Sequence, residues 1–218
     1  MTKKYHLSFP LFIGAILLFI TLTYGVINNA TWLQQFDHTL QHILIQRNTV
    51  LDFIFINITQ LGNSSTIAIL LMLICLLLGR LKNYRGMVLL LVNTIIFSGL
   101  VTIVVKQIIM RARPTPQLIL EHGFSFPSGH AMVSILFYGT LFLIIYREYR
   151  VLLIKRFLLT LLAMLMLIIP ISRVYINVHY PSDILAGISL GFILLYISSH
   201  YLFKLPRKLL EDNNHATI

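Results

Sequence analysis

Three short polar clusters interrupt an otherwise apolar sequence of 218 residues. The first reads K-x6-R-P, the second P-S-G-H and the third S-R-x5-H-x3-D. Together they supply cations, two imidazoles and a carboxylate, which are the groups needed to hold a phosphate ester and cleave it without a metal. The candidate site residues are Lys106, Arg113, Ser128, Gly129, His130, Arg173, His179 and Asp183.

The composition indicates a membrane protein. Hydrophobic residues make up 57% of the chain and charged residues only 11%, whereas soluble domains carry about 25% charged residues. The length suits a single domain over residues 1–218. The net charge of +10 favours contact with an anionic lipid surface. Base-reading motifs are absent from the sequence, so nucleic acid is not an expected partner.

The positions of the charges predict an all-α bundle of six transmembrane helices, since a bilayer core needs about 20 apolar helical residues. Lys3 and Lys4 precede the first apolar run, which has no convincing cleavage site and is therefore interpreted as a retained span. The fifth run is short and is expected to borrow residues from its flanks. The expected spans lie near 9–27, 62–79, 86–107, 128–146, 155–172 and 183–203.

Alternate loops differ in charge. One set of loops and both termini hold twelve of the Lys and Arg residues, and the other set holds five. The positive-inside rule then predicts that both termini are cytoplasmic. All three polar clusters are accordingly expected at the extracytoplasmic edge of the membrane.

Residues 28–61 form the longest segment between expected spans. Apolar residues recur there at helical spacing beside a polar face, which predicts a helix lying in the interface. A second apolar stretch, 51–58, is expected to dip into the bilayer. The apolar positions are Trp32, Phe36, Leu40 and Ile43 or Leu44, and the polar ones are Gln34, Gln35, Asp37, His38 and Gln41.

The second cluster precedes the fourth expected span. Ser128 is a suitable N-cap, and the free N–H groups of a first helical turn can bind phosphate. Gly129 lets the backbone approach an oxyanion closely. Taken alone, the same residues also fit an ordinary Pro-Ser helix cap beside a structural histidine.

The third cluster places His179 and Asp183 four residues apart at the start of the sixth span, where a helix makes them neighbours. Asp183 can accept from one ring nitrogen and leave the other with a lone pair, as in a catalytic triad. A structural Asp–His cap pair is the alternative. Nearby cations are expected to lower the pKa of both histidines, and Asp183 to raise that of His179.

The first cluster and Arg173 supply positive charge. Guanidinium groups bind two phosphate oxygens at once, and lysine acts as a point charge. Basic residues at span ends also commonly reach for lipid phosphates. Lys106, however, lies on the side where the orientation rule depletes cations. If a helix continued past Lys106, Arg113 would share its face.

Joined in one site, these residues predict phosphoryl transfer. The cations and the turn at Ser128 and Gly129 would neutralise the phosphate oxygens. His179 would attack phosphorus and become phosphohistidine, and His130 would protonate the departing alcohol before activating water.

The three clusters resemble the signature of the type 2 phosphatidic acid phosphatase family, part of a superfamily that includes vanadium haloperoxidases. Every residue that the signature specifies is present, in order and at the family's spacing, and the six-span plan is also similar. The resemblance implies a cofactor-free, metal-independent lipid phosphatase or pyrophosphatase. By motif, Lys106, Arg113, Ser128, Gly129 and Arg173 would bind phosphate. His130 would be the acid, His179 the nucleophile and Asp183 its partner.

The small size and basic inner loops resemble bacterial members of that family. These include phosphatidylglycerophosphate phosphatases and undecaprenyl pyrophosphate phosphatases of the cell envelope, which the residues do not separate. Phosphatidic acid is a third candidate substrate, and no protein partner is expected. Two further functions stay open: a lipid phosphotransferase with an alcohol acceptor, and a transporter that binds lipid or anion without hydrolysis.

Three residues near the clusters lie outside the motifs. Arg111 is expected to be an interfacial anchor rather than a catalytic residue. Glu121 and His122 lie in the loop above the site, where contact with a lipid head group is one alternative and exposure to solvent is the expected one. His38 and His42 have the spacing of metal ligands but no third ligand in the sequence, so they are expected on a solvated helix face. Gly187 and Gly191 are expected to allow close helix packing.

Overall fold

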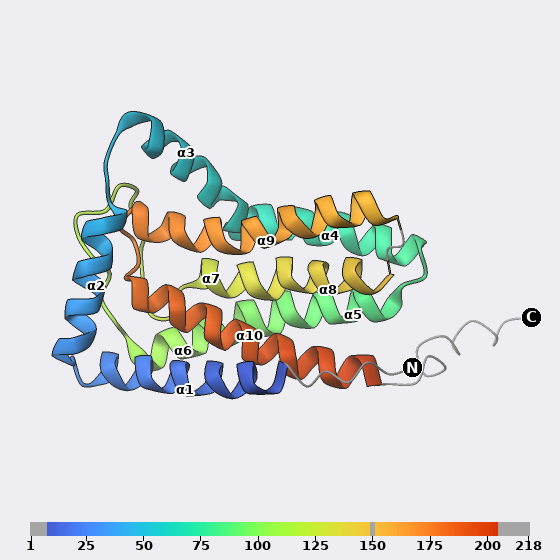
Figure 1. Ribbon diagram of the computed structural model, residues 1–218, viewed down its shortest axis with the longest axis horizontal. Helices are drawn as coiled ribbons and strands as arrows, with labels where there is room; N and C mark the ends of the chain where they lie inside the picture. The colour runs from blue at the N-terminus through green and yellow to red at the C-terminus, as the bar shows by residue number, and fades with distance from the viewer. Residues whose placement is uncertain (1–7, 149–150, 205–218) are drawn as a thin grey trace, which may run out of the picture.

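The computed structural model describes residues 8–148 and 151–204. Five of the cations used to predict orientation lie outside these residues: Lys3, Lys4, Arg150, Arg207 and Lys208. Within the described residues every regular element is a helix (Figure 1). The expected all-α membrane fold is therefore confirmed.

Most helices lie along one axis and form a bundle (Figure 1). Two long helical rods are each built from consecutive segments: α5 (Tyr84–Leu91), η2 (Val92–Val101) and α6 (Thr102–Ile109), and α7 (Gly129–Val133), η3 (Ser134–Tyr138) and α8 (Gly139–Glu148). The remaining long helices are α1 (Ser8–Ile27), α4 (Ser64–Arg80), α9 (Leu152–Tyr175) and α10 (Pro181–Lys204).

Five of these rods are long and apolar enough to cross a membrane: Phe9–Ile27, Tyr84–Ile109, Gly129–Glu148, Leu152–Tyr175 and Pro181–Tyr201. A sixth candidate is broken. Helix α3 (Thr49–Thr59) and the short turn η1 (Gln60–Gly62) precede α4, and the two halves meet at 51°. Helix α9 extends three residues beyond each end of the expected span 155–172.

Helix α2 (Thr31–Leu44) lies across one end of the bundle (Figure 1). The expected helix in this segment is present, but its buried residues are Leu33 and Asp37. Trp32, on the expected apolar face, is exposed. Asp37, expected among the polar residues of an interfacial helix, is instead buried, because its carboxylate has partners in the bundle.

The expected close packing at Gly187 and Gly191 is confirmed. A Cβ atom at Gly187 would lie 2.7 Å from the carbonyl oxygen of Ser128, and one at Gly191 would lie 3.0 Å from Cβ of Ile135. These two glycines let α10 pack directly on the rod that begins with α7. The backbone of the second polar cluster is thereby fixed against the first turns of α10.

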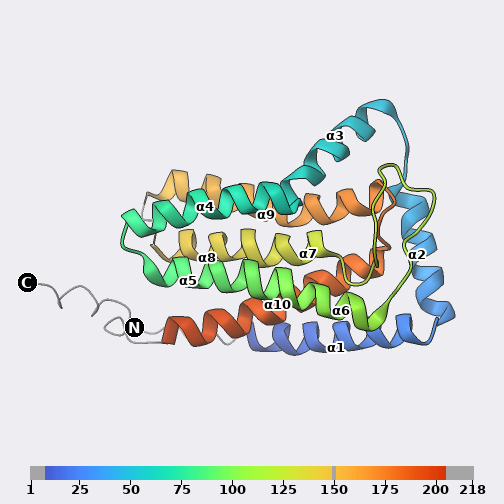
Figure 2. The same ribbon diagram turned by 180° about the vertical axis from the view of Figure 1, so that it is seen from behind.

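The two ends of the bundle differ. The α4–α5 and α8–α9 connections lie at the end opposite to α2 (Figure 2). The described cations at those connections are Arg80, Lys82, Arg85, Arg147, Lys155 and Arg156. The polar clusters gather at the α2 end.

Candidate active site

Local chain geometry brings all eight candidate residues to the α2 end. Helix α6 ends at Ile109 because Met110 adopts a left-handed conformation with φ of 52°. Arg113 therefore lies in a loop, and the helix shared with Lys106 does not extend to it. Ser128 caps α7, and its N–H donates to the carbonyl of Asp183 at 3.1 Å, which ties the second cluster to the third.

Three cations surround the centre of the site. Arg113 is held by the carbonyl oxygens of His122, Gly123 and Val178. Arg173, only 1% exposed at the end of α9, donates to Oγ1 of Thr59 at 2.9 Å. The Nζ of Lys106 contacts the carbonyl oxygens of Phe124 and Ser125. Loop carbonyls thus hold Arg113 and Lys106, and the hydroxyl of Thr59 holds Arg173, so that cations from separate elements gather in one site that could bind phosphate.

The expected His–Asp pair is present and buried. Nδ1 of His179 lies 3.4 Å from Oδ2 of Asp183 and has no hydrogen-bond partner. Oδ2 also accepts from the N–H of Tyr180 at 2.9 Å, which fixes the carboxylate. On its other side, Nε2 of His179 lies 3.1 Å from Nη1 of Arg113. The ring of His179 therefore lies between the carboxylate of Asp183 and the guanidinium of Arg113.

Burial, together with the charges of Lys106, Arg173 and Arg113, holds the pKa of His179 well below its ordinary value. The expectation that cations lower this pKa agrees with that direction, and Asp183 does not reverse it. His179 is neutral at neutral pH. A neutral imidazole has the lone pair that a nucleophile needs.

His130 is held by the break between α3 and α4. Its Nε2 lies 2.9 Å from Oδ1 of Asn63, and the backbone of Thr59 is a second hydrogen-bond partner of the ring. Asn63 is the N-cap residue of α4, yet its side chain does not cap that helix. A Cβ at Gly62 would come within 2.5 Å of Cδ2 of His130. The chain between α3 and α4 therefore packs directly against the His130 ring.

Comparison with known proteins agrees with the motifs and the fold. Residues 87–207 match the sequence profile of the PAP2 superfamily, the type 2 phosphatidic acid phosphatases. The chain belongs to the PAP2 superfamily. This matched region contains all eight candidate residues of the site.

A sequence relative and a solved structure extend the match to most of the chain. Phosphatidylglycerophosphatase B of Bacillus subtilis is 29% identical over 89% of this chain and 96% of its own length. A crystal structure of a transmembrane PAP2 type phosphatidylglycerolphosphate phosphatase from that organism superimposes with a TM-score of 0.79 and 28% identity, over 90% of this chain and 98% of that one.

Two further relatives match over less of the chain. Lipid A 1-phosphatase of Rhizobium etli is 33% identical over 52% of each protein. The crystal structure of Aquifex aeolicus LpxE, which is 23% identical, has a TM-score of 0.61 over 75% of this chain and 94% of that one, and supports the fold alone.

Two residues of this PAP2 site were not predicted from the sequence. Arg111 was expected at the interface, but its guanidinium donates to Oδ1 of Asp183 at 2.6 Å and to Oδ2 of Asp37 at 2.7 Å. Asp37 is only 2% exposed. The one available signal was the placement of Arg111 two residues before Arg113, inside the first cluster.

Glu121 was also interpreted incorrectly as a solvated loop residue. Its Oε1 accepts from Arg173 at 2.7 Å, and its Oε2 lies 3.9 Å from Nη2 of Arg113. A phosphate bound by these arginines would compete with this carboxylate. His122 contributes its backbone carbonyl to Arg113.

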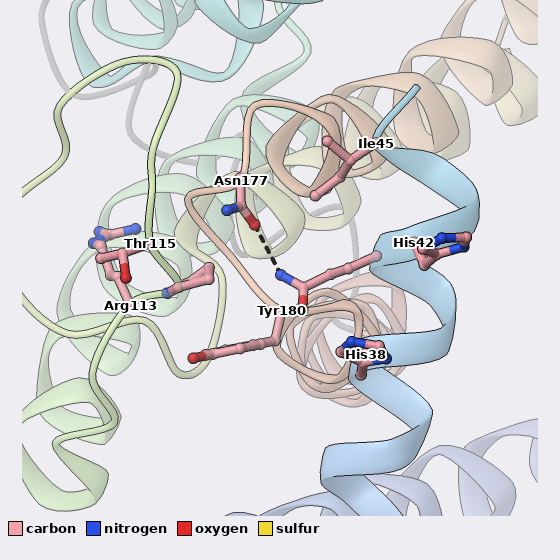
Figure 3. Close-up of a pocket in the computed structure, with 9 residues that line it drawn as sticks. His38, His42, Ile45, Arg113, Thr115, Asn177 and Tyr180 are labelled. Carbon is pink, nitrogen blue, oxygen red and sulfur yellow. Dashed lines mark hydrogen bonds between the residues drawn. The ribbon is translucent and has the colours of Figure 1, made fainter. Parts of the chain in front are cut away.

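Two of the cavities reach the site from different directions. One, of about 370 Å³, is lined by α4, η2 and α6 with a largely apolar surface that includes Ser and Thr side chains, and its wall also contains Lys106, Gly129 and His130. The other, of about 380 Å³, lies beside α2 and reaches Arg113 and Tyr180 (Figure 3). Its wall includes His38 and His42, and Gln41 donates to Asn177 across it at 2.8 Å.

Proposed function

We propose that this PAP2 protein hydrolyses a phosphomonoester or pyrophosphate of a membrane lipid, without a metal, through a phosphohistidine on His179. The observation that carries the proposal is the largely apolar cavity between α4 and the η2–α6 rod, whose wall also contains Lys106 and His130. A soluble phosphate ester has no need of such an approach. A lipid does, because its chain must stay in hydrocarbon while its phosphate reaches the cations.

The side walls of this cavity support entry from the bilayer. Ile95 and Ile103 line it and are 56% and 58% exposed. In a membrane-spanning rod, large apolar side chains with that exposure face lipid. The cavity, called the lipid groove below, therefore leads from the lipid-facing surface to the polar centre.

The chemistry follows from the placement of the two rings. The lone pair of Nε2 of His179 attacks phosphorus, and the P–O bond to the lipid breaks. Protonated His130, at the inner end of the lipid groove, gives its proton to the departing oxygen. Lys106, Arg113 and Arg173 neutralise the charge that develops on the phosphate oxygens.

A second displacement restores the enzyme. His130, now neutral, takes a proton from water, whose oxygen attacks phosphorus and releases inorganic phosphate and neutral His179. The products are the lipid alcohol, or lipid monophosphate from a pyrophosphate, and phosphate. The cavity beside α2 is the proposed route for water and phosphate, because it reaches Arg113 away from the lipid groove (Figure 3).

The proposed orientation has both termini in the cytoplasm and the site on the extracytoplasmic side. Its support is the positive-inside rule, since described cations collect at the end opposite to the site. Cysteine accessibility in intact cells tests it. A cysteine at Lys82 should react with a membrane-impermeant thiol reagent only after lysis, and one at Gln117 should react before lysis. Each is introduced with Cys75 replaced by Ala.

The first substrate to test is phosphatidylglycerophosphate, because the relative that matches most of the chain is named for it. Phosphatidic acid and undecaprenyl pyrophosphate fit the same geometry. The experiment is phosphate release from each lipid by purified protein in mixed micelles with EDTA present. We expect release from at least one lipid, and near-total loss in His179→Ala. Release that depends on an added divalent metal would contradict the mechanism.

The same assay separates the two alternatives. A phosphotransferase would transfer phosphate to an added alcohol at the expense of phosphate release. A transporter would retain substrate movement in His179→Ala proteoliposomes while the wild type releases no phosphate.

A further inference from the structure

The carboxylate of Asp183 is completely buried, and each of its oxygens has a separate task. Oδ2 faces His179 and accepts from the N–H of Tyr180. Oδ1 accepts from Nη1 of Arg111 at 2.6 Å. A buried carboxylate is strongly unfavourable unless it is paired and hydrogen-bonded. Arg111 is the guanidinium that pairs with it.

Arg111 is itself fixed on three sides. Its Nη2 donates to Oδ2 of Asp37 at 2.7 Å, and its Nη1 also donates to Oγ of Ser182 at 2.8 Å. Its guanidinium carbon lies 4.0 Å from the centroid of the Tyr180 ring. Burial opposes the charged form, but Asp183 and Asp37 outweigh it and raise the pKa of Arg111 above its ordinary value. The guanidinium is therefore a permanent charge with one available orientation.

Asp37 joins this arrangement to the first turn of α10. Its Oδ1 accepts from the N–H of Ser182 at 2.8 Å, and its Oδ2 accepts from Oγ of Ser182 at 2.7 Å. Ser182 immediately precedes Asp183. The carboxylate of Asp37 thus binds the guanidinium of Arg111, which pairs with Asp183, and the backbone N–H of Ser182, the residue before Asp183. Asp37 itself belongs to α2, outside the region that contains the motifs.

We propose that Asp37 and Arg111 are positioning residues for phosphoryl transfer, which pair with the buried carboxylate of Asp183 and keep it aimed at Nδ1 of His179. This inference rests on the proposed function. It assigns α2 a role in the chemical step, since α2 supplies the buried carboxylate that fixes Arg111. Neither residue contacts the phosphate-binding Arg113, Lys106 or Arg173 by a described hydrogen bond or ion pair. Their loss should therefore affect turnover more than substrate binding.

The test compares Asp37→Asn, Arg111→Lys and Arg111→Ala with Gln35→Ala, a control at an exposed position on the same helix. We expect kcat to fall roughly 100-fold in Arg111→Ala and roughly 10-fold in Asp37→Asn, the range set by lost charged hydrogen bonds. KM should stay within about 3-fold in both, because the phosphate contacts remain. Gln35→Ala should match the wild type.

Chemical rescue distinguishes positioning from general damage. A cavity of about 740 Å³ is lined in part by Asp37 and Arg111, so a small cation can reach the gap left by Arg111→Ala. Millimolar guanidinium chloride should restore roughly a tenth of the lost kcat or more, whereas equal sodium chloride or urea should not. Arg111→Lys should retain more activity than Arg111→Ala but less than the wild type.

Three results would overturn the inference: kcat within about 3-fold of wild type in folded Arg111→Ala and Asp37→Asn, a loss confined to KM, or equal rescue by urea. If Arg111→Ala is not recovered as folded protein, the near-isosteric Asp37→Asn decides alone. A wild-type protein that releases phosphate from no lipid would refute the proposed function instead, since the comparison of variants would then have no reference activity.

Discussion

Nη1 of Arg113 lies 3.1 Å from Nε2 of His179 in the centre of the site. An arginine side chain carries only donors, so Nε2 is the acceptor and bears the lone pair. The single proton of the neutral ring is then on Nδ1, which faces Asp183 at 3.4 Å. His179 therefore presents its lone pair on the side of Arg113, which is the tautomer that the proposed attack on phosphorus requires.

The low pKa of His179 predicts activity at acidic pH. Because burial and three cations disfavour the protonated ring, the nucleophile should stay neutral as the pH falls below about 6.5, the ordinary histidine value. The acidic limb of kcat/KM against pH should lie below that value. An acidic limb centred at or above it would contradict the assignment of His179 as a neutral nucleophile.

The same group predicts how stability depends on pH. The unfolded chain binds a proton to this histidine near pH 6.5, while the folded protein does so only at lower pH. The contribution of neutral His179 to stability is therefore full above about 6.5 and is lost as the pH falls toward the folded-state pKa. The melting temperature should fall in that window. His179→Gln should reduce this fall and leave melting at neutral pH less affected.

As a general acid, protonated His130 should accelerate phosphoryl transfer only when the leaving group is poor and needs a proton to depart. His130→Gln should lower kcat for an alkyl lipid phosphate by about 10²–10⁴-fold, the usual contribution of a general acid. The rate of phosphoenzyme formation from p-nitrophenyl phosphate should fall much less, because its leaving group departs without a proton. Equal losses on both substrates, measured as single-turnover rates, would assign His130 to phosphate binding instead.

The hydrogen bond with Asn63 should affect proton transfer by His130. Asn63→Ala removes the acceptor 2.9 Å from Nε2 and is expected to reduce kcat about 10-fold, equivalent to one net hydrogen bond. Asn63→Asp places a negative charge there and should move the basic limb of the pH profile to higher pH, because it favours protonated His130.

The matched control for Asn63 is Asn57→Ala, since the exposed side chain of Asn57 donates a hydrogen bond to the carbonyl of Phe53 within its own helix. Wild-type kinetics are expected for that variant. If Asn63→Ala also shows an unchanged pH profile and kcat, the corner between α3 and α4 has no part in proton transfer.

Packing at Gly187 should support the site. In Gly187→Ala, the new Cβ would lie 2.7 Å from the carbonyl oxygen of Ser128 and 2.8 Å from Cβ of Ala131. Such overpacking costs about 1–3 kcal/mol and should lower both the melting temperature and kcat, since the Ser128 turn must shift. Gly79→Ala, which meets no atom within 4 Å, is the control. Equal melting temperatures for the two variants would contradict this account.

The sequence predicted the parts of the site that stand out locally. Polar residues such as Lys106 and His179 are conspicuous in an apolar chain, and His179 and Asp183 are neighbours by helical spacing. The helical fold was likewise predictable, because length and hydropathy constrain membrane spans. These inferences need only positions that are close along the chain.

The supporting residues could not be predicted in the same way. Asp37 meets Ser182 across 145 positions of sequence, and Asn63 meets His130 across 67. Their roles depend on how α2 crosses the bundle end and on the bend between α3 and α4, and neither is encoded in local periodicity. Asp37 looked like one polar residue among several on its helix, until the fold placed it beside Arg111.

With substrate entering laterally through the lipid groove, as proposed above, the enzyme would meet its substrate in two dimensions. The quantity that governs its rate is then the mole fraction of phosphorylated lipid in the sheet around it, rather than the amount per volume of buffer. Diluting that lipid with an inert neighbour, at constant total substrate in the sample, slows turnover. The composition of the surrounding leaflet thus acts directly on catalysis, with no effector site on the protein.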